Sequence, residues 1–166
     1  MASKVQLDLL SSGKAVWNKW RRDYPDVRAI EPDLHGADLH GANLHGFNLH
    51  GADLTEANLQ NADLREADLQ EADLRNANLR GANLSDANLF EAHLRWADLR
   101  DATLCRTNLR WADFSNTDLR GANLDGANLG KAKFNGANIT KVERSEVTPS
   151  PTDFHEPDAV PTVVGV

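Results

Sequence analysis

Large apolar side chains occur at every fifth residue over most of the chain. The series runs from Leu34 to Ile139 in 22 consecutive pentapeptides, of which 19 are centred on Leu. Ala lies two residues before the centre in 18 of the 22, and Asp or Asn lies one residue before it in 19. The two residues after the centre are mostly polar. We write the centre as position i and the other four positions as i−2, i−1, i+1 and i+2.

A period of five matches neither an α-helix nor a β-strand. It matches a chain that turns a corner at every pentapeptide, so that four pentapeptides close one square coil. The pair at i−2 and i would then point inward, one small side chain beside one large. Asn or Asp at i−1 is expected at the corner, where its side chain can bond to nearby backbone. Gly recurs at i+2, where turns need or tolerate positive φ.

The A-(D/N)-L-x-x series resembles the pentapeptide-repeat family. The resemblance covers residues 31–141, about 5.5 coils. It implies an all-β solenoid, the right-handed quadrilateral β-helix, with an N-terminal α-helical cap like that of cyanobacterial members. The backbone of each coil would pair with the coils above and below at ~4.8 Å.

Residues 1–30 are expected to form a capping helix and a linker, because an open β-helix end is an exposed sheet edge. The spacing of Ser3 and Gln6 predicts a capping box at the start of the helix, and Pro25 would end it. Phe47 replaces the usual Ala in the first coil and is expected to contact the helix. The side chains expected to face the coil are Val16, Trp17, Trp20 and Tyr24.

Residues 142–166 contain four prolines and carry a net charge of −4. This composition predicts a flexible, Pro-rich acidic tail. Four valines near its end leave two alternatives open: the tail could cap the last coil, or it could pair with another chain. Accordingly we expect either a monomer or a homodimer formed through one end of the β-helix. The valines are Val160, Val163, Val164 and Val166.

Composition excludes several classes of protein. The formal net charge is −7, and the repeat region contributes −6 of it, so we expect no direct nucleic-acid binding. No segment approaches the ~18–20 apolar residues of a membrane span, and residues 1–10 lack a secretory h-region. Because the chain has one cysteine, an intrachain disulfide is impossible. These features predict a cytoplasmic protein.

Two residue types are weak candidates for chemistry. Four histidines follow centres of the first coil, but they would lie on four different sides and point apart, so we expect no metal site. Cys105 is expected to be an incidental exposed thiol, although Arg106 beside it could lower its pKa. A filled rod offers no cavity for a substrate, and no catalytic or cofactor motif is present. We therefore expect no enzyme activity and no cofactor. The histidines are His35, His40, His45 and His50.

Bulky aromatic side chains occupy outward positions only in the middle of the repeat. Trp and Arg are the side chains that most often anchor protein interfaces. The sequence therefore favours a non-catalytic scaffold that binds a partner protein. The alternative is an acidic DNA mimic that binds a DNA-handling protein such as DNA gyrase, as similar quinolone-resistance proteins do. The expected partner-binding residues are Phe90, Arg95, Trp96, Arg110 and Trp111.

Overall fold

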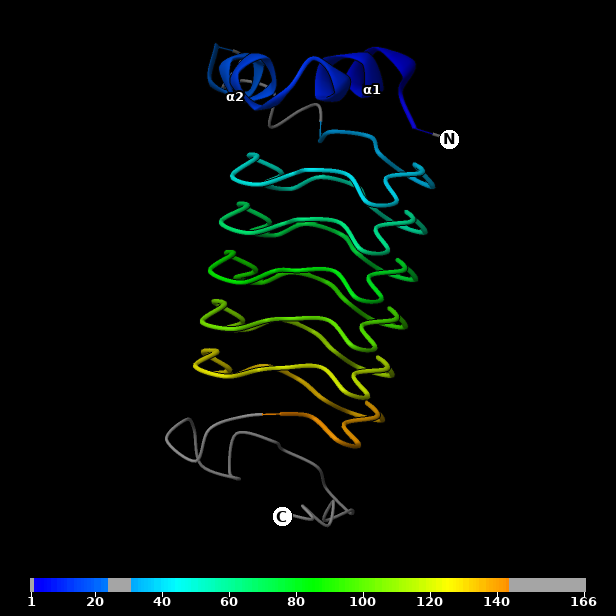
Figure 1. Ribbon diagram of the computed structural model, residues 1–166, viewed down its shortest axis with the longest axis vertical. Helices are drawn as coiled ribbons and strands as arrows, with labels where there is room; N and C mark the ends of the chain where they lie inside the picture. Colours follow the sequence, from blue (N-terminus) through cyan, green and yellow to red (C-terminus); the bar gives the residue numbers. More distant parts are fainter. Residues whose placement is uncertain (1, 24–30, 144–166) are drawn as a thin grey trace.

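The protein is a rod of stacked coils with two helices across its N-terminal end (Figure 1). A computed structural model describes residues 2–23 and 31–143. The helices are α1 (Lys4–Ser11) and α2 (Lys14–Asp23). The coils follow one another down the rod in chain order, so residues four pentapeptides apart in sequence lie directly above one another. We number the four sides by their first centres, Leu34, Leu39, Leu44 and Leu49.

Neighbouring coils are joined by parallel backbone pairing. Asp33 pairs with Asp53, and each later i−1 residue up to Asn123 pairs with its equivalent in the next coil. On each side the backbone N–H of a centre donates to the coil below, as Leu34 N does to Asp53 O at 2.8 Å. The backbone N–H of an i−1 residue donates to the coil above, as Asp53 N does to Pro32 O at 2.9 Å. These bonds confirm the predicted four-sided coil. The pairing is confined to single bridge residues, however, so no longer strand forms within residues 31–143.

The corners are β-turns with a residue in the left-handed region. In the first corner Ala37 N donates to Leu34 O at 3.0 Å, and Gly36 between them has a φ of 64°. Positive φ recurs at i+2 in all 22 pentapeptides, although only eight of these residues are Gly. Fourteen other residues therefore adopt a conformation that costs a non-Gly residue free energy.

The Asp and Asn residues at i−1 lie on the flat sides rather than at the corners, which corrects the expectation from sequence. Their side chains still bond to nearby backbone: Asp33 Oδ1 accepts a hydrogen bond of 3.2 Å from His35 N. The same bond recurs around the rod, as from Arg80 N to Asn78 Oδ1 at 3.2 Å. Each of these side chains thus fixes the backbone N–H of the i+1 residue, with which the next corner begins. The backbone of the same i−1 residue pairs with adjacent coils.

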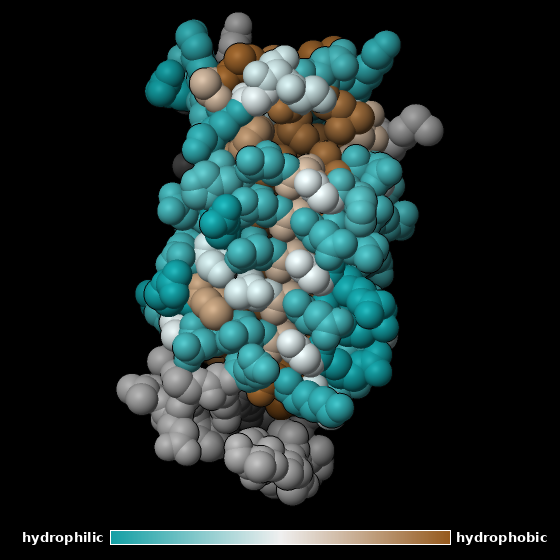
Figure 2. Space-filling model, in the orientation of Figure 1, coloured by the Kyte–Doolittle hydropathy of each residue, from teal (hydrophilic) through white to brown (hydrophobic). Residues whose placement is uncertain are grey.

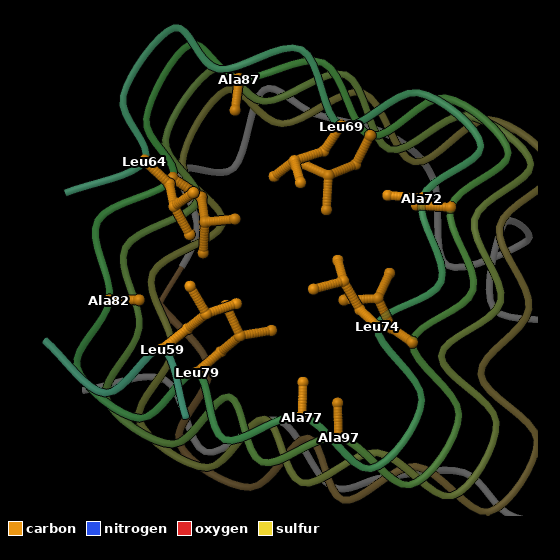
Figure 3. Packing of buried hydrophobic residues seen from close by; sticks show 14 of the residues in the cluster. Leu59, Leu64, Leu69, Ala72, Leu74, Ala77, Leu79, Ala82, Ala87 and Ala97 are labelled. Carbon is orange, nitrogen blue, oxygen red and sulfur yellow. The ribbon is translucent and has the colours of Figure 1, made fainter. Parts of the chain in front are cut away.

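The interior is filled by the centres and the small residues before them. Leu centres in the middle coils are fully buried, and the Ala residues at i−2 are buried beside them. Figure 3 shows leucines from all four sides pointing toward one another while the alanines line the walls. Thr107 and Thr117 replace two of these alanines, and their hydroxyls donate to the carbonyls of Leu84 and Leu94. The leucines that represent the four sides are Leu59, Leu64, Leu69 and Leu74.

The N-terminal cap consists of two helices, so the prediction of one helix was wrong. Gly13, with a φ of 94°, lies between them and ends α1 in a conformation that favours Gly. The predicted capping box was also wrong: the Ser3 side chain makes no cap hydrogen bond. Gln6 instead turns toward the rod, where its Oε1 accepts a hydrogen bond of 2.6 Å from Asp33 N.

Of the side chains expected to face the first coil, Trp17 and Trp20 pack against the core as predicted. Trp17 is completely buried, and its ring centroid lies 5.1 Å from that of Trp20 and 6.4 Å from that of Phe47. The expected contact of Phe47 with the helix is therefore confirmed. Val16 was wrongly included, because it is 44% exposed. Tyr24, Pro25 and the tail from residue 144 lie outside the described residues.

Polar groups of the cap bond to the edge of the first coil. Ser3 N donates to Asp33 O at 2.9 Å. Asn18 bonds twice, from its Nδ2 to Gly46 O at 2.9 Å and through its Oδ1 to Asn48 N at 2.8 Å. Arg21 Nη2 donates to His50 O at 2.6 Å. Apart from Gly46 O, the backbone groups that the cap bonds are those that later coils pair with the coil above, so the cap covers an otherwise exposed edge.

Candidate functional site

The five residues predicted to bind a partner lie at two neighbouring corners of the rod. Phe90, Arg110 and Trp111 are at the corner between sides 4 and 1, whereas Arg95 and Trp96 are at the corner between sides 1 and 2. Trp96 N donates a hydrogen bond to Ser115 O in the next coil. Trp111 lies at the start of side 1 in that coil and Ser115 lies at its end, so Trp96 is one coil above the end opposite Trp111. The two tryptophans therefore flank side 1 on adjacent coils. We name these five residues the side-1 surface.

Cations lie over two of the aromatic rings. Arg110 Cζ is 6.0 Å from the Phe90 centroid, and the two residues occupy equivalent positions of adjacent coils, 20 residues apart. Lys131 Nζ is 5.4 Å from the Trp111 centroid. The sequence-based set did not include Lys131, although counting one coil on from Trp111 would have found it. Both tryptophans remain accessible, with Trp96 61% and Trp111 46% exposed.

The flat side between the two tryptophans carries His93, Asp113 and Lys133 in adjacent coils. Burial alone would raise the pKa of Asp113, but hydrogen bonds from the Ser115 hydroxyl and backbone N–H, with the charges of Lys133 and Arg95, hold that pKa below 3.8. Asp113 therefore stays ionised beside two cations. His93 and Lys133 interrupt an otherwise acidic column.

The arginines of the repeat divide into two groups. Six lie within 4 Å of a carboxylate. Within residues 2–23 and 31–143, Arg95 and Arg110 form no such ion pair, and both belong to the side-1 surface. A guanidinium with no carboxylate within 4 Å is more available to an incoming molecule than one held in an ion pair. The six pairs are Arg65–Asp63, Arg75–Asp73, Arg80–Asp101, Arg100–Asp98, Arg106–Asp86 and Arg120–Asp118.

The histidines and the cysteine make no cluster with one another. His35 Nδ1 lies 2.6 Å from Thr55 Oγ1, and His45 Nε2 lies 3.8 Å from Glu66 Oε2. In the part of the chain that the structure describes, no three His, Cys, Asp or Glu residues are grouped as metal ligands. Arg106 does lower the pKa of Cys105, as expected, but it does not determine the net shift. Burial and the charge of Asp125 outweigh Arg106, which is paired with Asp86, and raise the pKa of the thiol.

A second surface feature lies between the cap and the first coil. A groove of about 450 Å³ runs past Leu10 and Lys14 on one wall and Ala42, Leu44 and Phe47 on the other. Figure 2 shows apolar side chains gathered at this end of the rod, while most of the visible surface of the coils is polar. The groove belongs to the packing of the cap on the coil and brings together no charged pair.

Comparison with known proteins identifies the fold family. Residues 33–70, 67–104 and 106–142 match the family described as "Pentapeptide repeats (8 copies)". The chain belongs to the pentapeptide repeat family. A comparison with curated protein sequences gave no match.

Solved structures of other pentapeptide repeat proteins are similar to this chain. The protein Rfr23 from the cyanobacterium Cyanothece 51142 is 32% identical, with a TM-score of 0.63 over 75% of this chain and 95% of that one. A pentapeptide repeat protein from the thylakoid lumen of Arabidopsis thaliana is 34% identical, with a TM-score of 0.59 over 62% and 72% of the two chains. Neither α1 nor α2 is long and apolar enough to cross a membrane, and no other helix occurs in residues 2–23 and 31–143.

Proposed function

We propose that this pentapeptide repeat protein is a non-catalytic, cytoplasmic scaffold that binds a partner protein through the side-1 surface. One observation carries the proposal: the exposed aromatic residues occur together with the two repeat-region arginines that form no ion pair within the described residues. Trp and Arg are enriched among the side chains that contribute most to binding. An aromatic ring beside an available guanidinium suits a partner that offers both apolar and acidic groups.

The rod favours binding by holding these side chains on a regular framework. The backbone around Trp96 and Trp111 is bonded to the next coil, through Trp96 N to Ser115 O and Trp111 N to Gly130 O. Binding then orders little additional backbone, and the entropic cost of association is correspondingly smaller. Burial of two exposed tryptophans would supply apolar area at the centre of the contact.

The alternative, DNA mimicry, receives less support from the distribution of charge. A DNA mimic needs rows of available carboxylates, and the repeat region has a net charge of −6. Asp63, Asp73, Asp98 and Asp118 are each paired with an arginine two residues later. Each pair places a positive charge beside its carboxylate, so the sides that carry these pairs lack a continuous row of available carboxylates. Inhibition of DNA gyrase supercoiling by the purified protein would support the alternative and count against the scaffold.

The scaffold is tested by comparing wild type with the Trp96→Ala/Trp111→Ala variant. Affinity capture from the native host identifies a partner that the wild type retains and the variant loses, and calorimetry with the purified partner then gives both affinities. We expect the variant to bind at least thirtyfold more weakly, since anchor residues contribute about 2 kcal/mol or more and 1.4 kcal/mol is tenfold. Its stability should change by only about 0.5 kcal/mol.

The matched control is Arg65→Ala/Arg106→Ala, which removes two exposed side chains from the corner between sides 3 and 4. This control should bind the partner as wild type does. Equal affinity of the tryptophan variant and wild type would contradict the proposal and would move the search for a binding surface to other corners.

A further inference from the structure

The cap closes the first coil through hydrogen bonds on two of its four sides. In the later coils, three backbone groups on each side bond to the coil above: the N–H and C=O of the i−1 residue and the C=O of the i+1 residue. In the first coil the cap supplies such bonds at Asp33 on side 1 and at Asn48 and His50 on side 4. Sides 1 and 4 are therefore the covered part of the edge.

Sides 2 and 3 of the first coil carry the same backbone groups without partners. Asp38 and Asn43 each present an N–H and a C=O at this edge, and His40 and His45 each present a C=O. None of these six backbone groups forms a hydrogen bond with residues 2–23 or 31–143. We call them the open edge.

Exposure of the surrounding side chains agrees with an uncovered edge. Asp38 and Asn43 are exposed, whereas their equivalents on sides 1 and 4 are half-buried. Ala42 is partly exposed, although every Ala at i−2 in residues 52–132 is buried. Unpaired backbone beside accessible apolar side chains offers an added strand both hydrogen bonds and apolar contact.

The apolar groove between the cap and the first coil lies along the side-3 part of the open edge. Leu44 and Phe47 line it from the coil, and Leu10 lines it from α1. Its volume of about 450 Å³ lies within the roughly 300–1,000 Å³ of ligand-binding pockets. A strand whose backbone pairs with Asn43 would place a large side chain over Leu44, because the centres of adjacent coils stack in this register.

The charge at the end of the groove is positive. Lys14, the first residue of α2, lies over Gly46, where its Nζ comes within 3.1 Å of the position that a Cβ would occupy. Lys14 forms no ion pair within residues 2–23 and 31–143, and the first turn of α2 contains no acidic residue. Because Gly46 is the i+2 residue of its pentapeptide, an acidic residue at i+2 of an added strand would complement this charge.

A second copy of the coils does not fit on the open edge. The two cap helices lie across the same end of the rod and bond to sides 1 and 4, so a further complete coil has no room to stack there. A single extended segment needs only the uncovered sides. The edge therefore suits a peptide rather than another rod.

We propose that the open edge binds an extended segment of a partner protein by strand addition. The segment runs parallel to residues 42–46, in the position that a coil above would occupy, and its backbone bonds to the N–H and C=O of Asn43 and to the C=O of His45. A large apolar side chain enters the groove over Leu44, and an acidic residue two positions later lies beside Lys14. This interaction is separate from the side-1 surface and does not require it.

NMR of the full chain with a synthetic peptide tests the proposal. The probe is acetyl-Ala-Asn-Leu-Ser-Glu amide, which follows the repeat pattern and places Glu over Gly46. In free wild type the Asn43 amide should exchange much faster than the Asp63 amide, which is bonded to the first coil. Saturating peptide should slow exchange at Asn43 by roughly tenfold or more, while the Asn48 amide, already paired by the cap, should be unchanged.

Matched changes separate backbone pairing from charge. A peptide with N-methylleucine lacks the N–H that donates to Asn43 C=O and should bind roughly tenfold more weakly. Lys14→Glu should weaken binding of the Glu peptide and strengthen binding of a peptide that ends in Lys, whereas Lys4→Glu, elsewhere on the cap, should change neither. Trp96→Ala/Trp111→Ala should bind the peptide as wild type does, so a failure of this proposal and a failure of the side-1 surface are distinguishable.

Protection of the Asn43 amide in free, dilute wild type would overturn the proposal, because the edge would already be covered. Protection that grows with protein concentration would assign the edge to a second copy of the chain and would overturn it as well. Equal binding of the N-methylated peptide, or an Asn43 amide that millimolar peptide leaves unchanged, would show that no strand is added at this edge.

Discussion

The indole Nε1 of Trp17 donates a hydrogen bond of 2.6 Å to the carbonyl oxygen of Asn48. One coil later, the equivalent carbonyl of Asp68 accepts the backbone N–H of Leu49 at 2.7 Å. Within the described residues, Trp17 therefore takes the place of the backbone donor that a coil above would supply. The cap closes the rod by reproducing the hydrogen-bond pattern of the repeat as well as by covering its apolar interior.

Trp17→Phe should destabilise the protein by about 1–3 kcal/mol. Phe keeps an aromatic ring against Phe47 but cannot donate to Asn48, so a carbonyl at the covered edge loses its partner. Denaturant unfolding measures the change. Trp20→Phe is the control, because Trp20 packs on Trp17 and makes no side-chain hydrogen bond to the described residues. Equal stability of both variants would contradict the role given to Nε1.

We expect the interior to tolerate neither larger nor smaller side chains. Ala82 and Leu84 are fully buried as the i−2 and i residues of one pentapeptide. Ala82→Leu should cost about 1–3 kcal/mol by overpacking, and Leu84→Ala about 2–5 kcal/mol by opening a cavity. Gln60→Leu, at an outward position, should change stability by only about 0.5 kcal/mol. Thermal unfolding of the three variants within two degrees of one another would rule out a tight interior.

The sequence predicts the coils because the geometry repeats. The same five-residue pattern recurs from Leu34 to Ile139, so an error at one pentapeptide is corrected by its neighbours, and stacked residues can be paired by counting. Counting 20 residues on from Phe90 leads to Arg110, whose guanidinium lies over the Phe90 ring. The same count from Trp111 leads to Lys131, which the sequence-based set did not include.

The cap is less predictable because it occurs once. Helical spacing identified Trp17 and Trp20, yet the helix break depends on the conformation of Gly13 alone. The side chain of Gln6 had two competing partners, its own helix and the backbone of Asp33. Only the position of the cap on the rod decides between them, and no periodicity in the sequence encodes that position.

Residues with positive φ offer a way to stabilise the rod. Glu56 has a φ of 58° and is exposed. The left-handed conformation costs a non-Gly residue roughly 1–2 kcal/mol, which exceeds the roughly 0.5–1 kcal/mol lost through the greater flexibility of Gly. Glu56→Gly should therefore raise the melting temperature. Gln60→Gly, at i+1 where φ is not positive, should lower it. A decrease in both variants would show that the turns relieve the strain in another way.

Acid should weaken the rod through its aspartate–arginine pairs. Arg65 donates from Nε to Asp63 Oδ1 at 2.8 Å and from Nη2 to Oδ2 at 2.7 Å. These bonds lower the pKa of Asp63 from 3.8 to about 2. The folded state therefore binds the proton less readily than the unfolded state does. The stability that Asp63 contributes is complete above about pH 4 and is lost as the pH falls toward 2.

Melting temperatures between pH 2 and 6 test this linkage with Asp63→Asn. The variant should be less stable than wild type above pH 4, and the two curves should converge toward pH 2, because the wild-type side chain becomes neutral there. Both side chains are partly exposed, so the difference should be small and should shrink in high salt. Arg65→Ala should return the pKa of Asp63 toward 3.8, which carboxyl NMR titration measures directly. A titration of Asp63 that is unchanged without the Arg65 side chain would show that the hydrogen bond from the backbone N–H of residue 65, rather than the guanidinium, sets its acidity.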